Sequence, residues 1–462
     1  FGVPAAPAVD VWFHSFGNNL VRVGENVRDR NFSDAPEQGK HYGRRVGFLI
    51  SLLPQFPRLT ELWRWSRKQR ALVAALPYPA AVLDCHVSLL DVLRCHAAAA
   101  WQWRLVRRWR RLANVRGCCE FSGIACDDIL LDEFERSFRG SIQQTMLYAI
   151  GLANFLSKET ATPTVVTYGE LLGPMRAIYH LARKAKQEVR LITIQHAMDC
   201  RNKLGAYARA QEFAQHGEAE GNCFSPTPDL FLVQGTQYRE ILEGFFPPQR
   251  VRTIGSLKYD CWMVALGRQV EITGRVRQKL GVGGRRLLVV APSVNDDAEI
   301  FNVLQRVPLG DGWLMVGLPH PVISRERLAL TAALYGFGTQ LIIPEEMSML
   351  DLLVACDLVV CGSSTVAIEA AIFSKPAIRI IGIDTFPQFP EDPMIPCFSD
   401  PVELTNWLAS DFVLASHRSK ESYRAMAEKY FHKIDGHARD RLWHAITSHQ
   451  AVMQTRSSEC SC

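Results

Sequence analysis

The sequence predicts an α/β protein made of two Rossmann-like units that face a central cleft, followed by C-terminal helices. Three observations lead to this fold class. Short apolar runs of strand length recur along the chain, and helical segments lie between most of them. This alternation is typical of parallel sheets covered by helices. The series also ends and begins again near residues 258–281, which divides it into two units.

The first unit is predicted to contain seven strands. They are Val9–Phe16, Val46–Leu53, Ala80–Asp84, Thr164–Tyr168, Arg190–Ile194, Leu230–Val233 and Val251–Ile254. The helices expected between them are Leu59–Leu76, Leu89–Leu112, Asp128–Leu156 and Gly173–Lys186. We expect this unit to occupy residues 1–262.

The second unit begins after a helix-like stretch, Val270–Leu280, that leads into a glycine-rich turn. Its predicted strands are Arg286–Ala291, Trp313–Gly317, Gln340–Ile343, Leu358–Val360 and Ala377–Ile380. We expect this unit to occupy residues 263–420. Residues 421–462 then form one or two helices and a disordered tail.

Composition excludes several classes of protein. The 462 residues are 48% hydrophobic and 21% charged with a net charge of +5, which gives no reason to expect a nucleic-acid partner. No apolar run reaches the roughly 18–20 residues that span a bilayer. The 13 cysteines form no CxxC pair, so we expect neither a disulfide framework nor a zinc site but reduced thiols in the cytoplasm. The chain begins with Phe1 rather than Met and shows no signal peptide, so we expect either a trimmed chain or a domain of a longer protein.

Two short motifs of the second unit supply phosphate-binding chemistry. His320 lies between two prolines just after a strand, and the prolines keep its loop out of a helix or a sheet. Ligands of doubly wound sheets bind at the carboxyl ends of the strands. We therefore expect His320 to contact the phosphates of a donor substrate such as a nucleotide sugar. The alternative is a partly buried histidine with a structural role.

The second motif is a run of three hydroxyl side chains, Ser363, Ser364 and Thr365, between an apolar strand and a helix. Backbone N–H groups and hydroxyls at such a position form an anion site, although serine and threonine also serve as simple helix caps. The strands that precede His320 and Ser363 are expected to be neighbours. Glu369 lies one turn later and either orients the loop or faces solvent.

Carboxylates and histidines also follow strands of the first unit. Glu170 comes directly after Thr164–Tyr168, where it can act as the general base that deprotonates an acceptor hydroxyl. His196 follows the next strand and can assist it. The alternatives are a helix-start charge for Glu170 and a structural hydrogen bond for His196.

Three further positions are weaker candidates. Asp296 and Asp297 lack a third carboxylate and are interpreted as a helix start, so no metal site is expected. Ser293, in the same loop, can contact phosphate. Glu345 and Glu346 begin another predicted helix, near which a base or ribose can lie.

The segment Trp101–Arg116 alternates arginine and tryptophan around a short amphipathic helix. Helices of this composition lie in anionic membrane interfaces. The alternative is a solvated arginine face with its tryptophans in the core.

The motifs at His320-Pro321 and Ser363–Thr365 resemble those of bacterial surface-carbohydrate glycosyltransferases with the GT-B fold. The chain looks most similar to enzymes that use CMP-activated acid sugars, namely Kdo transferases and bacterial sialyl- and polysialyltransferases. The resemblance implies a metal-independent enzyme without a cofactor, whose donor site contains His320, Ser363, Ser364 and Thr365. Glu369 and Ser293 are added to this site from their positions in the sequence. The resemblance also implies Glu170 as the base, although the acid-acid-Gly form of the sialyltransferases is absent.

The implied partners are a nucleotide sugar and a glycan or lipid-linked glycan in the biosynthesis of capsule, O-antigen or lipopolysaccharide. The implied location is the cytoplasm, with contact to the inner membrane through Trp101–Arg116. Asp435–Leu442 also resembles the ending of glycerophosphotransferases that use CDP-glycerol. The sequence is compatible as well with a non-catalytic nucleotide-binding component of an assembly complex and with a UDP-sugar epimerase.

Overall fold

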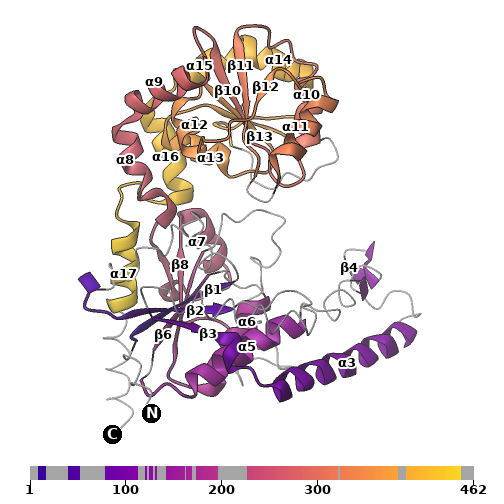
Figure 1. The fold of residues 1–462 in the computed structure, drawn as a ribbon, viewed down its shortest axis with the longest axis vertical. Coiled ribbons are helices and arrows are strands. Elements are labelled where there is room, and N and C mark those ends of the chain that lie inside the picture. Colours follow the sequence, from indigo (N-terminus) through magenta and orange to yellow (C-terminus); the bar gives the residue numbers. More distant parts are fainter. Residues whose placement is uncertain are drawn as a thin grey trace.

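Two parallel β-sheets, each covered by helices, form the computed structural model of the chain (Figure 1). The structure describes residues 9–16, 40–51, 79–112, 120–121, 124–127, 131–132, 142–161, 163–168, 173–195, 226–320, 323–382 and 392–448. We call the part around the N-terminal sheet the lower body and the part around the second sheet the upper body, as they lie in Figure 1.

The lower body contains a seven-stranded parallel sheet in the order β3-β2-β1-β6-β7-β8-β9. Its strands are β1 (Val11–Phe16), β2 (Val46–Ser51), β3 (Ala80–Val82), β6 (Thr164–Tyr168), β7 (Arg190–Ile194), β8 (Leu230–Val233) and β9 (Val251–Thr253). Helices α5 (Ile142–Leu156) and α6 (Gly173–Ala185) bury one face of this sheet. A small antiparallel pair, β4 (Glu120–Phe121) and β5 (Ile124–Ala125), lies apart from it, and α7 (Thr236–Glu243) follows β8.

The upper body contains a six-stranded parallel sheet in the order β12-β11-β10-β13-β14-β15. Its strands are β10 (Arg286–Val290), β11 (Trp313–Gly317), β12 (Leu341–Ile342), β13 (Leu358–Cys361), β14 (Ala377–Ile380) and β15 (Cys397–Phe398). One face packs on α8 (Trp262–Gly267), α9 (Gln269–Lys279), α12 (Met349–Ala355), α13 (Val366–Ile372) and α16 (Lys420–Phe431). The other face packs on α10 (Asp297–Leu304), α11 (Arg325–Leu334), α14 (Pro401–Ala409) and α15 (Asp411–Ser416).

The predicted fold class is confirmed, because both sheets are parallel and wound in both directions from a central strand. Most predicted strands are present to within one or two residues at each end. Parallel strands are buried on both faces and therefore read as continuous apolar runs, which explains why they could be found. The helix predicted at Asp128–Leu156 is described only as α5, and the one at Leu59–Leu76 lies outside the described residues.

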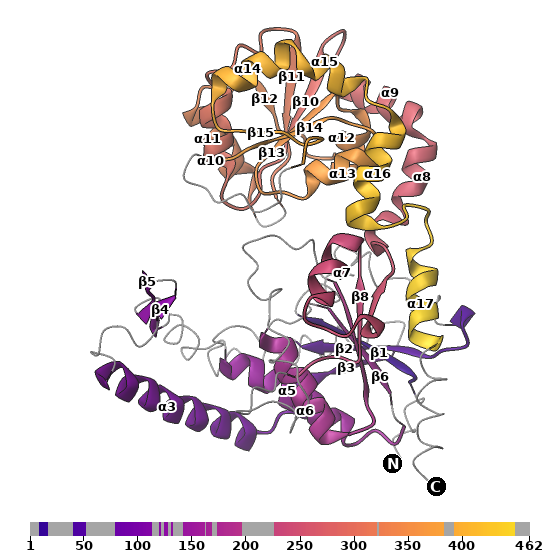
Figure 2. The same cartoon turned by 180° about the vertical axis from the view of Figure 1, so that it is seen from behind.

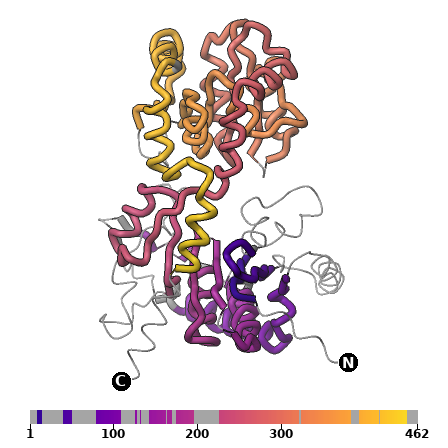
Figure 3. Tube along the Cα trace, turned by 90° about the vertical axis from the view of Figure 1, so that its left-hand side faces the viewer, coloured from indigo at the N-terminus to yellow at the C-terminus, as the bar shows by residue number. Residues whose placement is uncertain are grey.

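The last helix of the described chain returns to the lower body. After α16 the chain crosses downward, and α17 (Ala438–Ser448) lies along the face of the lower sheet that α5 and α6 leave uncovered (Figure 3). Leu442, Trp443 and Ile446 are buried there, and the Trp443 ring packs edge-on against Phe13 of β1. The core of the lower body is thus completed by residues from the far end of the sequence.

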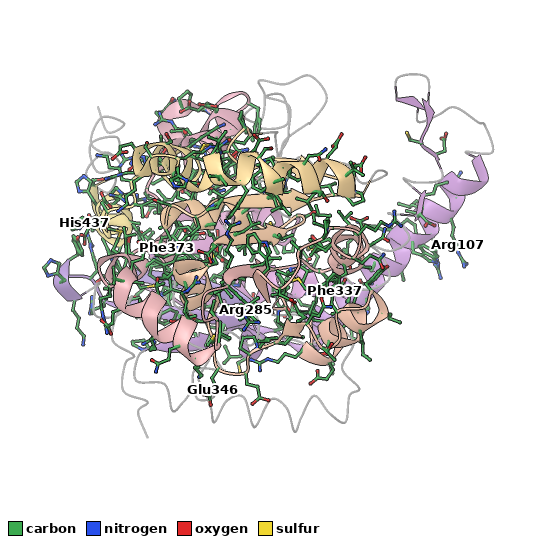
Figure 4. The ribbon with its side chains drawn as sticks, turned by 90° about the horizontal axis from the view of Figure 1, so that it is seen from above. Arg107, Arg285, Phe337, Glu346, Phe373 and His437 are labelled. Carbon is green, nitrogen blue, oxygen red and sulfur yellow. The ribbon has the colours of Figure 1, made fainter. Side chains whose placement is uncertain are left out.

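Helix α3 (Leu89–Leu112) is the predicted Leu89–Leu112 helix, and it extends away from both bodies as an arm (Figure 2). It begins with a reciprocal pair of bonds between Ser88 and Asp91, in which each backbone N–H donates to the other side chain. Its first turns contact α5, whereas its second half projects outward. Seen from above, Arg107 lies on this arm well outside the rest of the molecule (Figure 4).

Candidate functional site

The loops that follow β10 and β13 lie side by side at the carboxyl edge of the upper sheet. These two strands are hydrogen-bonded neighbours, and the sheet order reverses between them. Ligands of doubly wound sheets bind at such a reversal. Our expectation that the strands before His320 and Ser363 are neighbours is wrong, because β10 lies between β11 and β13. After β12 the chain crosses to the opposite side of β10, where β13 begins the other half of the sheet. The order of strands along the sequence does not show where such a crossing occurs.

Asp296 ties the two loops together. One carboxylate oxygen accepts the backbone N–H of Ser293 at 2.5 Å, and the other accepts that of Ser363 at 2.7 Å. The side chain is 8% exposed. Burial raises the pKa of Asp296, while these two N–H bonds oppose the shift. Asp296 does precede α10, as predicted, but its carboxylate binds across the loops instead of capping that helix.

Gly362 is required by the same contact. A Cβ at this position would lie 2.3 Å from a carboxylate oxygen of Asp296, and this is closer than any real Cβ contact. The glycine before the three hydroxyl residues therefore makes room for the carboxylate. It also leaves the Ser363 backbone N–H occupied by Asp296 and not open to a ligand.

A cavity of about 320 Å³ lies between these loops. Ser293, Asp296 and Ser363 line it, together with Glu299 and the end of β14 at Ile380. Glu299 accepts the backbone N–H of Gly382 at 3.2 Å and so fixes the end of that strand. The structure thus brings two of the predicted donor residues, Ser293 and Ser363, to one cavity.

The next two hydroxyls are bonded within their own segment. Ser364 Oγ accepts the backbone N–H of Val366 at 3.3 Å, and Thr365 Oγ1 donates to Glu369 Oε1 at 3.2 Å. Of the two roles expected for Glu369, it therefore has the first: it orients the loop and does not face solvent.

Glu369 is 2% exposed and is the centre of a polar cluster. Besides Thr365, its Oε1 atom accepts hydrogen bonds from Lys258 Nζ at 2.7 Å and Tyr259 Oη at 2.8 Å. Burial, with the adjacent Glu369 charge, raises the pKa of Tyr259 well above its ordinary value. The second oxygen, Oε2, is buried and has no hydrogen-bond partner among the described residues. Buried carboxylate oxygens normally have a hydrogen-bond partner, so this atom is an exception in the cluster.

Of the remaining candidates from the sequence, none that the structure describes lines this cavity. His320 is half-buried after β11, and its carbonyl accepts the N–H of Ile323 at 2.8 Å, but it is not among the described residues that line the cavity. Glu170 and His196 lie outside the described residues. The strands that precede them, β6 and β7, are hydrogen-bonded neighbours along their whole length. Glu345 and Glu346 precede α12 and do not line the cavity either.

The two bodies are joined by a double crossing of the chain. Residues 254–260 lead upward from β9, and residues 432–438 lead back down to α17. Asp260 accepts the backbone N–H groups of Ala438 and Arg439 at 3.0 and 2.8 Å, and Arg441 Nε donates to the carbonyl of Ile254 at 2.7 Å. The Asp435–Leu442 motif thus connects the bodies in this structure.

The carboxyl edge of the lower sheet meets the upper body at β8. Gly235, directly before α7, packs on the backbone of Tyr430 in α16, where a Cβ would lie 2.2 Å from the Tyr430 carbonyl oxygen. Thr236 Oγ1 donates to the carbonyl of Lys429 at 3.1 Å. The strand ends of the lower sheet are therefore turned toward the body that holds the cavity.

Across the described ranges, no three His, Cys, Asp or Glu side chains are grouped as metal ligands. Among the helices that the structure describes, none is long and apolar enough to cross a bilayer. The seven cysteines within the described part of the chain are free thiols: Cys85, Cys95, Cys126, Cys261, Cys356, Cys361 and Cys397.

Several solved structures share this architecture. A putative UDP-N-acetylglucosamine 2-epimerase from Listeria monocytogenes aligns with a TM-score of 0.50 at 13% identity, over 96% of this chain and 96% of that one. The UDP-GlcNAc 2-epimerase from Neisseria meningitidis, bound to UDP-GlcNAc, aligns with a TM-score of 0.50 at 11% identity, over 95% and 99%.

The chain has the GT-B fold. The wall teichoic acid polymerase TagF is a further match, with a TM-score of 0.46 and 14% identity over 96% of this chain and 89% of that one. No protein-family model and no curated protein sequence matches the chain. Its GT-B architecture therefore comes from structure alone.

Sequence reasoning missed Lys258, Tyr259 and Asp296 as parts of the site. Lys258 and Tyr259 were visible only as the end of the first series of strands. Their contact with Glu369 joins positions about 110 residues apart, and no local spacing indicates it.

Proposed function

We propose that the chain is a GT-B glycosyltransferase of surface-polysaccharide biosynthesis. It moves Kdo or a sialic-acid-like sugar from a CMP-activated donor to a glycan or glycolipid acceptor of a capsule, O-antigen or lipopolysaccharide. Residues 263–420 bind the donor, and residues 1–262 bind the acceptor. The nucleotide sugar is a co-substrate, and no further cofactor takes part.

The cavity between the loops after β10 and β13 is the observation that supports this proposal most. It lies at the reversal of the upper sheet and is lined by the hydroxyl residues Ser293 and Ser363. In the proposal these hydroxyls, with that of Ser364, donate to the CMP phosphate, and Thr365, whose own hydroxyl donates to Glu369, contributes its backbone N–H. Fixed donors of this kind stabilise the charge that develops on the departing nucleotide. Glu369 orients the donor-binding hydroxyl segment through Thr365, and His320 closes over the phosphate.

The acceptor chemistry is assigned to the lower body. The acceptor oxygen attacks the anomeric carbon of the sugar as the bond from that carbon to the phosphate oxygen breaks. Glu170, helped by His196, takes the acceptor proton. Both residues directly follow neighbouring strands, β6 and β7, whose sheet meets the upper body at its carboxyl edge. Closure of the two bodies excludes water from the transfer.

Contact with the inner-membrane surface through Trp101–Arg116 is part of the same proposal, because a lipid-linked acceptor is presented there. The described portion of this segment belongs to α3. Trp101 is 62% exposed and Leu105 is 49% exposed, next to exposed arginines on the arm. Aromatic and basic side chains on one exposed helix suit the surface of an anionic bilayer.

A thermal-unfolding screen against CMP, CDP, UMP, UDP, GDP and ADP tests the donor. Saturation at about a hundred times the dissociation constant stabilises a protein by roughly 2.7 kcal/mol. We expect selective stabilisation by CMP that is lost in His320→Ala. Selective stabilisation by CDP supports the glycerophosphotransferase alternative instead. Preference for a uridine or guanosine nucleotide, or no response at all, contradicts the CMP donor.

The variant Glu170→Gln separates an enzyme from a non-catalytic nucleotide-binding partner. A general base contributes about 10²- to 10⁴-fold to a rate, so this variant should lose turnover by that factor and retain CMP binding. A chain whose turnover is unchanged by the substitution does not use Glu170 as its base.

A further inference from the structure

Lys258 connects the crossing between the bodies to Glu369 of α13. It lies in the crossing that leads from β9 to α8, and its ammonium donates to Glu369 Oε1 at 2.7 Å. Thr365 Oγ1 donates to the same oxygen at 3.2 Å. The ammonium and the last of the three hydroxyl side chains therefore meet at one carboxylate atom.

The exposure of this ion pair is unequal. The Glu369 side chain is 3% exposed, whereas that of Lys258 is 49% exposed. An ammonium has three N–H donors, and one of them is used by Glu369. The other two have no hydrogen-bond partner among the described residues. Since the Lys258 side chain is half-exposed, these two donors are within reach of solvent and of a ligand.

Two aromatic rings fix the position of the ammonium. Lys258 Nζ lies 5.4 Å from the ring centre of Tyr259 and 5.2 Å from that of Trp262. Both rings are almost fully buried, and both belong to the core of the upper body. Cation–π contacts at such distances restrict a side chain that is otherwise flexible. The open donors are thus held in place before any ligand arrives.

We propose that Lys258 is a catalytic residue that binds the donor phosphate and neutralises the charge that develops on it. This inference rests on the proposed transferase function. As the bond from the anomeric carbon to the phosphate oxygen breaks, its electron pair stays on that oxygen, and the ammonium remains protonated and donates to the phosphate. The acceptor proton goes to Glu170.

The test compares the affinities of cytidine and CMP for the wild-type protein, Lys258→Met, Lys258→Arg and Lys279→Met by calorimetry. Lys279 is the matched control, since it is an exposed lysine of the upper body paired with Glu346 at 3.2 Å. In the wild type, CMP should bind more tightly than cytidine. Lys258→Met should weaken CMP by about 10- to 100-fold, as expected for a hydrogen bond to a charged group. It should leave cytidine unchanged, Lys258→Arg should recover part of the loss, and Lys279→Met should match the wild type.

Thermal unfolding without ligand shows whether each variant is folded, and a variant that fails this check is replaced by Lys258→Gln. Lys258 does not bind phosphate if Lys258→Met prefers CMP over cytidine by the same factor as the wild type does. The same conclusion follows if the wild type binds CMP no more tightly than cytidine. If uridine nucleotides bind best and the gain from their phosphate is lost in Lys258→Met, the cytidine donor is wrong and the role of Lys258 stands.

Discussion

Gly362 is the residue at which the candidate site leaves least room. The space that a Cβ would occupy at Gly362 is filled by a carboxylate oxygen of Asp296. This carboxylate holds the loops after β10 and β13 together. We expect Gly362→Ala to destabilise the protein by about 1–3 kcal/mol, the cost typical of overpacking. It should also weaken CMP binding, because the displaced Asp296 would release the backbone of Ser363. Urea unfolding and calorimetry measure the two effects.

The control for this substitution is Gly274→Ala in the interior of α9, where an added Cβ would meet nothing within 4 Å. Alanine is the better helix former by about 0.5–1 kcal/mol, so this variant should be slightly more stable than the wild type. A Gly362→Ala protein as stable as the Gly274→Ala protein would show that the loops are not held by Asp296.

His14 should make the protein sensitive to acid. It is 1% exposed in β1, and burial lowers its pKa from 6.5 to about 4. Because the unfolded chain takes up this proton first, stability is lost as pH falls through the window between these two values. The full loss is about 3 kcal/mol, of which about 2 kcal/mol falls between pH 7 and pH 5.

Urea unfolding at pH 7 and pH 5 tests this, with His14→Leu as the comparison. The variant should lose about 2 kcal/mol less than the wild type over this range. The exposed His437 is the control. Its hydrogen bond to Asp440 raises its pKa, so its protonation favours the folded state as pH falls, opposite to that of His14. An equal acid sensitivity in the wild type and His14→Leu would mean that His14 is protonated without cost in the folded state.

Single residues of the candidate site could be proposed from the sequence where their signal is local. The hydroxyl run and Ser293 were found because each follows an apolar strand, and the structure places Ser293 and Ser363 at one cavity. Lys258 and Asp296 were missed because their roles depend on contacts across the fold. The Lys258 contact spans 111 positions, and the Asp296 contact spans 67.

Among the elements, α3 has the most unusual surface. It contains six arginines and one aspartate, so this single helix has a net charge of +5, equal to that of the whole chain. Its inner face, with Cys95 and Ala99, is buried. The outer face exposes Leu89, Leu93 and Trp101 by 72%, 59% and 62%. Apolar and cationic groups on the same outer face are what the proposed contact with an anionic bilayer requires.

The double variant Arg104→Gln/Arg108→Gln should therefore bind anionic vesicles more weakly. Each basic residue near such a surface contributes about 1 kcal/mol, so the loss should be about 30-fold. Sedimentation with phosphatidylglycerol vesicles measures it, and phosphatidylcholine vesicles should bind neither protein. Arg306→Gln/Lys420→Gln removes the same charge from exposed positions of the upper body and should behave like the wild type. Equal loss in both double variants would mean that only net charge matters.

At the level of elements, the sequence was most successful where an element is long or fully buried. The bounds of α3, β6, β7, β8, β11 and β14 agree with those predicted. Strand β15 was not predicted, because two residues at the edge of a sheet give no periodic signal. The order of strands was wrong at one point for a different reason: a list of strands does not fix on which side of β10 the chain continues.

The whole molecule depends on a connection that no local pattern shows. Helix α17 is the last described element, yet it completes the core of the lower body, where it packs against β1, β2 and their neighbours. Asp260 caps it from the opposite crossing of the chain through two backbone N–H groups. The lower body is therefore not a continuous segment of the chain, and it should not fold from residues 1–262 alone.

This dependence can be tested by ending the chain at Ile434 and supplying residues 435–448 as a peptide. Without α17, the lower sheet exposes the face that buries Leu442, Trp443 and Ile446, and each such side chain contributes about 1.5–3 kcal/mol. We expect the shortened chain to show one unfolding transition, that of the upper body. In hydrogen exchange, the amide protons of β1 and β6 should be unprotected. The peptide should restore protection of both strands, whereas a peptide with Trp443→Ala should do so poorly. Protection of β1 and β6 without any peptide would show that the lower body folds independently of α17.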